Sequence, residues 1–160
     1  MNTPFLNQVY ERVDFDRDLV FKFFTIFSLF EYALKKAGFR QGNEKSVEAD
    51  WESFAKAIHN HFDPSNSPEL QQAVDYLLTH PTKKQIVHGG NLLFVNSGVV
   101  NHQTIWLATL INRTRNNLFH GGKFRFDRPR DPELLKSSLV ILESWARLNP
   151  DIEQELRNVQ

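Results

Sequence analysis

The segment Phe21-Lys-Phe-Phe-Thr-Ile-Phe-Ser-Leu-Phe30 decides the fold class, because it would be apolar on most sides of a helix. It lies within a predicted helix from about Asp16 to Ala37, which Gly38 ends. A helix of this kind must be covered on most of its surface. We therefore expect it in the centre of a helical bundle or in a contact between subunits.

Further helices are predicted where apolar residues recur at helical spacing behind a cap or a proline. Their expected ranges are about 46–62 with Ser46 as N-cap, about 67–80, from about 101 to the glycines at 121 and 122, from Asp131-Pro132 to about 148, and a short one after Asn149-Pro150. The second helix should bury Val47, Trp51, Phe54, Ala55 and Ile58. Residues 41–45, 63–67 and 121–130 read as loops, and residues 84–96 as a small β-hairpin with a glycine turn. The sequence predicts an all-α bundle with this hairpin before the 101–120 helix.

Composition indicates one globular domain spanning residues 1–160. Hydrophobic residues make up 41% of the chain and charged residues 24%, as in ordinary soluble proteins. The chain has no cysteine, which excludes disulfides, thiol chemistry and cysteine-based zinc sites. No apolar run approaches ~18 residues and the first residues lack the pattern of a signal peptide, so we expect a cytoplasmic protein without a membrane partner.

The segment Arg113-Thr-Arg-Asn-Asn-Leu-Phe-His-Gly-Gly-Lys123 is the strongest indication of chemistry. It places four residues between Arg115 and His120 at the end of an apolar helical pattern. A guanidinium holds phosphate oxygens and an imidazole transfers protons near neutral pH, which together suffice for metal-free chemistry on a phosphodiester. An arginine and a histidine on a solvated helix end are also common, so a structural interpretation stays open.

These residues resemble the Arg-x(4–6)-His signature of the HEPN superfamily, in which a polar residue, here Asn116, usually follows the arginine. The run from Arg115 to Lys123 is similar to the Apea-like HEPN group in particular. The resemblance implies a homodimeric helical bundle that acts as a metal-independent endoribonuclease in toxin–antitoxin or antiviral defence, with a cognate antitoxin or defence-system partner. Other HEPN proteins are inactive scaffolds. The alternatives are therefore a non-catalytic module that binds nucleotide, RNA or protein, and a plain helical interaction protein.

The expected reaction needs no cofactor and no metal. His120 would transfer protons, and Arg115 would stabilise the negative charge that develops on the phosphate. Asn116 shares a helix face with His120 and could orient the imidazole, bind phosphate, or be an ordinary polar residue. The resemblance makes Glu31 the candidate third partner, on an early helix, to hold His120 or Arg115; an exposed glutamate is an equal alternative. One histidine cannot be base and acid in one step, and a two-fold dimer would supply the second.

Basic residues gather beside this motif although the net charge of the chain is zero. Between positions 113 and 130, six of them stand against Asp127 alone. Those expected to bind RNA phosphates are Arg113, Lys123, Arg125, Arg128 and Arg130. His59, His61 and Asp63 have the composition of a metal cluster, but residues two apart on a helix diverge by about 200°. We therefore expect no metal site there.

Overall fold

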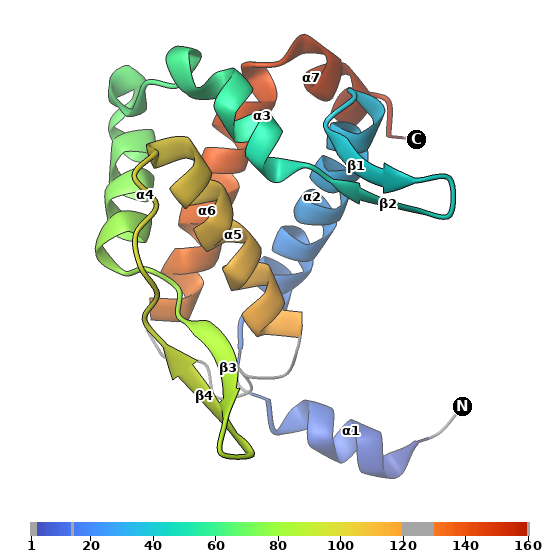
Figure 1. The fold of residues 1–160 in the computed structure, drawn as a ribbon. Coiled ribbons are helices and arrows are strands. Elements are labelled where there is room, and N and C mark those ends of the chain that lie inside the picture. Colours follow the sequence, from blue (N-terminus) through green and yellow to red (C-terminus); the bar gives the residue numbers. More distant parts are fainter. Residues whose placement is uncertain (1–2, 14, 120–129, 160) are drawn as a thin grey trace.

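The computed structural model describes residues 3–13, 15–119 and 130–159 (Figure 1). The described chain is mostly helical, which confirms the predicted helical fold class. In chain order its elements are α1 (Pro4–Glu11), α2 (Arg17–Lys36), β1 (Arg40–Asn43), β2 (Ser46–Ala49), α3 (Trp51–Ile58), the 3₁₀ turns η1 (His59–His61) and η2 (Pro64–Asn66), α4 (Pro68–Thr79), β3 (Lys84–His88), β4 (Asn91–Val95), α5 (Gln103–Phe119), α6 (Arg130–Arg147) and α7 (Pro150–Arg157).

Helix α2 has the range that the sequence predicts, and both of its ends show why. At its start the Asp16 carboxylate accepts a hydrogen bond of 3.0 Å from the Leu19 N–H, as an N-cap does. At its end Gly38 has a φ of 94°, and the Phe39 N–H donates to the Leu34 carbonyl at 2.9 Å. This turn is a Schellman motif, which needs a residue that tolerates the left-handed conformation.

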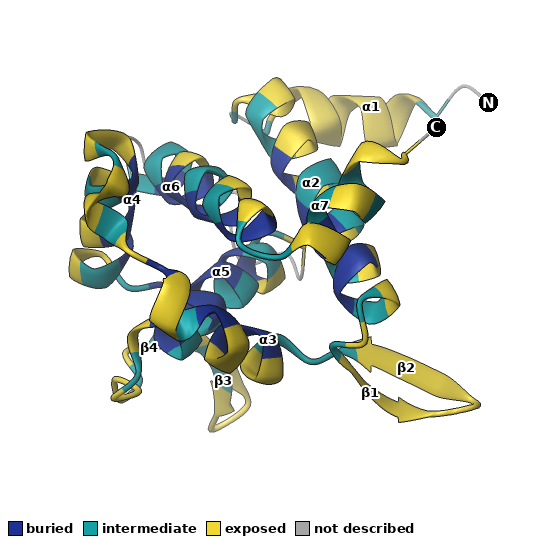
Figure 2. Ribbon diagram, turned by 90° about the horizontal axis from the view of Figure 1, so that it is seen from above, coloured by how far each residue is buried: buried dark blue, intermediate teal, exposed yellow. Residues whose placement is uncertain are grey.

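The core forms where α2, α5 and α6 turn their apolar faces toward each other (Figure 2). Helix α2 packs against α6 and α7, α4 packs against α6, and α5 packs against α3. The largest fully buried side chain among the described residues is Trp145 on α6, whose ring lies nearly perpendicular to those of Phe54 and Phe62. By contrast, α1 has no buried residue and lies outside this core (Figure 2). The sequence did not predict α1.

The predicted loop at 41–45 is wrong, because strands β1 and β2 form an antiparallel hairpin there. Gly42 has a φ of 120°, and a Cβ at this position would lie 2.2 Å from the Ser46 carbonyl oxygen. The Asn43 side chain closes the turn by accepting hydrogen bonds from the N–H groups of Lys45 and Ser46. Nearly every residue of the two strands is exposed, so no alternation of apolar and polar residues marks them in the sequence.

The N-cap of the second predicted helix lies four residues later than expected. Ser46 lies in β2, and the N-cap of α3 is Asp50, whose carboxylate accepts from the Ser53 N–H at 3.0 Å. Val47 is consequently exposed, while the other residues of the expected inner face are buried or partly buried. The Asp50 carboxylate also brings a negative charge to the positive end of the helix dipole, which favours the start of α3 at this position.

The remaining elements follow the sequence closely. Ser67 and Asn149 are the N-caps of α4 and α7, and each is followed by the predicted proline. The hairpin β3–β4 turns at Gly89 and Gly90, which both have a positive φ.

The predicted start of the long helix at Asp131 is wrong. The described part of α6 already includes Arg130, so Asp131 is a buried helical residue within it and not a cap in front of it. Among the described helices, none combines the length and apolar character needed to cross a bilayer.

Candidate functional site

Arg115 lies one turn before the described end of α5, on the side of that helix that faces α2. Earlier in the same helix, Leu107, Leu110 and Ile111 pack into the core. Figure 1 shows this end of α5 at the same end of the molecule as the β3–β4 hairpin. The motif arginine is therefore presented by a helix whose position the core determines.

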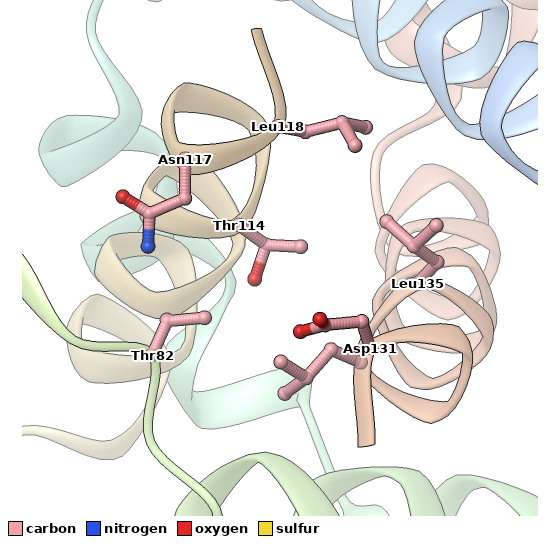
Figure 3. A pocket seen from close by; sticks show the side chains of 7 residues that line it. Thr82, Thr114, Asn117, Leu118, Asp131 and Leu135 are labelled. Atoms are coloured by element: carbon pink, nitrogen blue, oxygen red, sulfur yellow. The ribbon is translucent and has the colours of Figure 1, made fainter. Parts of the chain in front are cut away.

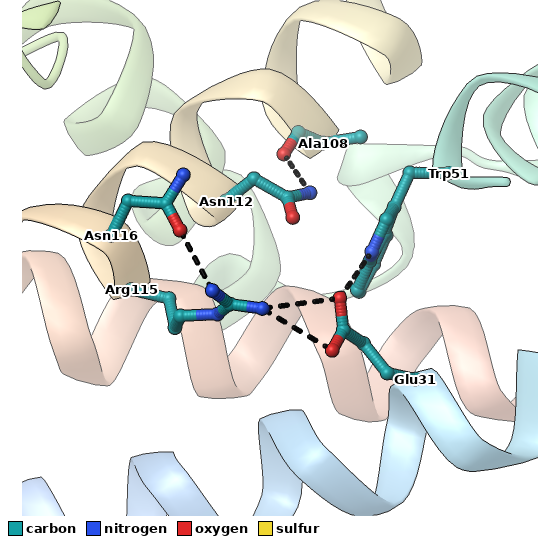
Figure 4. A network of polar contacts seen from close by, with 6 residues as sticks. All are labelled: Glu31, Trp51, Ala108, Asn112, Arg115 and Asn116. Carbon is teal, nitrogen blue, oxygen red and sulfur yellow. Dashed lines mark hydrogen bonds and ion pairs between the residues drawn. The ribbon is translucent and has the colours of Figure 1, made fainter. Parts of the chain in front are cut away.

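Three side chains from α2 and α5 contact the guanidinium, and Figure 4 shows two of them, Glu31 and Asn116. Arg115 Nη2 lies 3.3 Å from Glu31 Oε2 and 3.5 Å from Glu31 Oε1. Arg115 Nη1 donates to Asn116 Oδ1 at 2.9 Å. Beneath it, the ring of Phe27 lies 5.0 Å from the guanidinium carbon, within cation–π range. The structure thus brings together three residues that the sequence singled out: Glu31, Arg115 and Asn116.

Trp51 also belongs to this group, and the sequence pointed only to its place on an inner helix face. Its indole N–H donates to Glu31 Oε1 at 3.1 Å. Its ring stacks on Phe27 and Phe30 at centroid distances of 5.2 and 5.4 Å. Stacking on the rings of Phe27 and Phe30 fixes the indole, and the indole in turn fixes the Glu31 carboxylate through its hydrogen bond. Trp51 and Glu31 are 20 positions apart in the sequence, so no local pattern could reveal this contact.

The Glu31–Arg115 ion pair is partly open to solvent. The side chains are 26% and 31% exposed, so water screens the attraction and the pair itself stabilises the fold by at most ~1 kcal/mol. The contacts of Arg115 with described residues use at most three of its five N–H donors. The guanidinium can therefore donate to phosphate oxygens while Glu31 and Asn116 hold it.

A hollow of about 160 Å³ opens beside the ion pair. The side chains that line it come from α2 and from the end of α5: Phe24, Phe27, Ser28, Glu31, Arg115 and Phe119. Phe24 and Phe119 touch each other, with their ring centroids 5.1 Å apart. The hollow is far larger than one water molecule requires.

His120 follows the last described residue of α5 and lies outside the described residues, as do Lys123, Arg125 and Arg128. The proposed roles of these four residues stay predictions from the sequence. The structure describes helix α5 up to Phe119, the residue directly before His120.

The other two predicted RNA-binding residues do not lie with Arg115. Arg113 is two residues earlier on α5 and points to another side, where it donates to the Ser97 hydroxyl and covers the Trp106 ring at 5.1 Å. Burial lowers the pKa of Arg113 below its ordinary value. Arg130 donates to the Pro81 carbonyl at 3.0 Å. Both arginines therefore make contacts within the fold.

A second cavity lies between the end of α5, the start of α6 and Thr82 (Figure 3). Its volume of about 20 Å³ suits roughly one water molecule. The hydroxyl groups of Thr82 and Thr114 both donate to the Leu110 carbonyl, and the Asn117 amide donates to the Lys83 carbonyl. These polar groups tie the loop before β3 to α5, so we assign this cavity a structural role.

His59 and His102 form a pair that the sequence did not predict. Their ring centroids are 4.1 Å apart, and the Nδ1 atom of each ring lies within 3.3 Å of the Thr104 hydroxyl oxygen. That hydroxyl donates to the Ala55 carbonyl, which links α5 to α3. Among the residues that the structure describes, no three histidine, aspartate or glutamate side chains gather as metal ligands.

Comparison of the chain with protein-family models, with curated proteins and with solved structures finds no match.

Proposed function

We propose that the chain is a metal-independent endoribonuclease of the HEPN type, in which Arg115 and His120 act on a phosphodiester of RNA. The observation that supports this most strongly is the held guanidinium. Arg115 is braced by Glu31, Asn116 and Phe27 while it keeps N–H donors for a phosphate. In the sequence His120 follows five residues later, directly after the described end of α5. The proposed reaction requires a positioned arginine to stabilise charge and two histidines, one from each of two chains, to transfer protons.

In the proposed reaction the ribose 2′-oxygen attacks the adjacent phosphorus, and the bond from phosphorus to the 5′-oxygen breaks. The products are a 2′,3′-cyclic phosphate and a free 5′-hydroxyl. Arg115 stabilises the charge on the phosphate oxygens in the transition state. One His120 removes the proton of the 2′-hydroxyl, and the other, from a second copy of the chain, donates a proton to the departing oxygen.

RNA would be held by phosphate contacts around this site. We assign the main contacts to Lys123, Arg125 and Arg128, with smaller contributions from Arg113 and Arg130 because those two already make contacts within the fold. The biological setting that we propose is toxin–antitoxin or antiviral defence, with a cognate protein that restrains the nuclease.

The test is cleavage of single-stranded RNA in the presence of a chelator. We expect cleavage to persist, to leave cyclic phosphate ends, and to spare DNA, which has no 2′-hydroxyl. His120→Ala and Arg115→Ala should each remove most turnover without unfolding the protein. Arg147→Ala is the matched control, because it removes an exposed arginine paired with Glu143 on α6. Loss of activity in chelator, equal cleavage of DNA, or full turnover in His120→Ala would reject the proposal.

A second candidate is a non-catalytic HEPN module that binds RNA or nucleotide. One observation favours it: Glu31 already neutralises the charge of Arg115, as in an ordinary structural ion pair. This candidate predicts RNA binding that weakens as salt rises, with no cleavage under any condition.

A further inference from the structure

The hollow beside Arg115 has walls of two chemical kinds. Its apolar lining includes the rings of Phe24 and Phe119, which are 45% and 46% exposed although both are large. Its polar lining includes Glu31 and Arg115, which form the ion pair. Phe27 lies beneath the guanidinium and is almost completely buried. An apolar wall beside a donor and an acceptor is typical of sites for small planar ligands.

The aromatic wall suits a flat ring. Phe24 and Phe119 come from different helices, with their rings 5.1 Å apart and inclined by 48°. Proteins that bind single-stranded nucleic acid commonly stack bases on exposed aromatic side chains of this kind. Stacking of a base on these exposed rings would remove apolar surface of both partners from water.

The polar wall suits the edge of a nucleobase. Glu31 Oε1 accepts from Trp51 and Arg115, while Glu31 Oε2 has Arg115 as its contact among the described residues. A carboxylate has about four lone-pair sites, so Oε2 can accept one more N–H. The guanidinium, with at least two donors left, can donate to a carbonyl or ring nitrogen. Every base has an N–H donor next to such an acceptor on its Watson–Crick edge.

We propose that this hollow is a subsite for one unstacked nucleobase of single-stranded RNA, adjacent to the phosphate that Arg115 holds. The subsite rests on the proposed function, since it places a base next to the bond to be cleaved. It recognises a base by stacking and by one donor–acceptor pair, so it accepts all four bases. Purines should bind more tightly than pyrimidines because they offer a larger stacking surface.

The experiment compares adenosine 5′-monophosphate with ribose 5-phosphate, which has the same phosphate and no base. The chain has three tryptophans, and the indole N–H resonance of Trp51 is identified by its loss in Trp51→Phe. Because this N–H donates to Glu31, its chemical shift reports on the carboxylate that lines the hollow. We expect the nucleotide to shift the Trp51 resonance in a saturable manner and ribose 5-phosphate to shift it much less.

Phe24→Ala should weaken nucleotide binding roughly tenfold, as loss of a base-stacking aromatic does. Phe21→Ala is the matched control. Phe21 is on the same helix one turn earlier, it is 69% exposed, and it does not line the hollow. Both residues are exposed, so melting curves of the two variants should stay close to that of the wild type.

Equal shifts with the two phosphates, an unmoved Trp51 resonance, or equal effects of Phe24→Ala and Phe21→Ala would each overturn the subsite. These readouts do not depend on catalysis. A chain that binds the nucleotide through Phe24 but cleaves no RNA would keep the subsite and reject the nuclease. A chain that cleaves RNA but whose Trp51 resonance does not shift with the nucleotide would keep the nuclease and reject the subsite.

Discussion

At the scale of single residues, Glu31 links the aromatic core to the motif. One of its oxygens accepts from the indole of Trp51, and both contact the guanidinium of Arg115. Trp51 itself stacks on Phe27 and Phe30. Core packing therefore fixes the Glu31 carboxylate, and the carboxylate in turn fixes the partly exposed side chain of Arg115. We interpret Glu31 as a residue that positions Arg115 and does not itself touch the reacting atoms.

Glu31→Gln tests this interpretation. Glutamine keeps an oxygen for the Trp51 N–H but loses the charge that holds Arg115. We expect kcat for RNA cleavage to fall roughly tenfold or more, because a misplaced guanidinium stabilises the transition state poorly. The free energy of unfolding should fall by no more than ~1 kcal/mol, since the pair is partly exposed. Steady-state kinetics and urea unfolding measure the two effects.

The control is Glu153→Gln, which breaks a more exposed ion pair with Arg157 within α7. It should change neither quantity appreciably. If Glu31→Gln kept the turnover of the wild type, Arg115 would need no positioning by this carboxylate.

At the scale of elements, α3 depends on its first turn. Asp50 receives hydrogen bonds from the backbone N–H and the hydroxyl of Ser53, at 3.0 and 2.7 Å. These bonds favour the ionised carboxylate and hold the pKa of Asp50 below its ordinary value of 3.8. The cap matters for the site because Trp51 is the first residue of α3. A frayed first turn would release the indole that holds Glu31.

Asp50→Ala should lower the free energy of unfolding by about 1 kcal/mol at neutral pH, the usual effect of losing an N-cap. The pKa of Asp50 is lower in the folded than in the unfolded protein. The ionic contribution is therefore complete above the unfolded pKa and is lost as pH falls through the folded one. Urea unfolding of wild type and variant over a pH series should show the difference shrinking below pH 3.8.

Asp50→Asn is the matched variant, because asparagine also caps helices but does not titrate. Its difference from Asp50→Ala should be independent of pH. A constant difference between wild type and Asp50→Asn across the same series would contradict the role of the charge.

At the scale of the whole molecule, the described chain includes Arg115 and the residues that hold it, while His120 lies outside the described residues. The core is continuous from α2 to α7, whereas α1 exposes Phe5, Leu6, Val9 and Tyr10. The mechanism needs two histidines, and each chain has one in the motif. The proposed nuclease must therefore be a homodimer with two His120 side chains at a shared cleft.

If the active enzyme is this dimer, its specific activity should depend on protein concentration. Specific activity should fall on dilution below the dissociation constant of the dimer, and light scattering at micromolar concentration should give twice the mass of the chain. Adding excess inactive His120→Ala protein to wild type should lower activity by forming mixed dimers with only one histidine. A monomer with undiminished specific activity at every concentration would contradict the two-histidine mechanism.

Much of the fold and part of the candidate site follow from the sequence alone. The apolar helix at 16–37, the caps at Ser67 and Asn149 and the glycine turn at 89–90 were predictable because each depends on neighbours within a few residues. Arg115, Asn116 and Glu31 were likewise singled out by the motif and its resemblance. The β1–β2 hairpin was not predictable, because its exposed polar strands have no hydrophobic period.

Only the tertiary structure decided how these residues meet. The indole of Trp51 reaches Glu31, and Glu31 reaches Arg115 across 84 positions of the chain, because α2, α3 and α5 pack around shared aromatic rings. Packing also decided that Arg113 and Arg130 make contacts within the fold. In the sequence, both belong to the same cluster of basic residues between positions 113 and 130. Local sequence determines where a helix begins and ends. Which side chains share a site depends on burial of the core, which is a property of the whole chain.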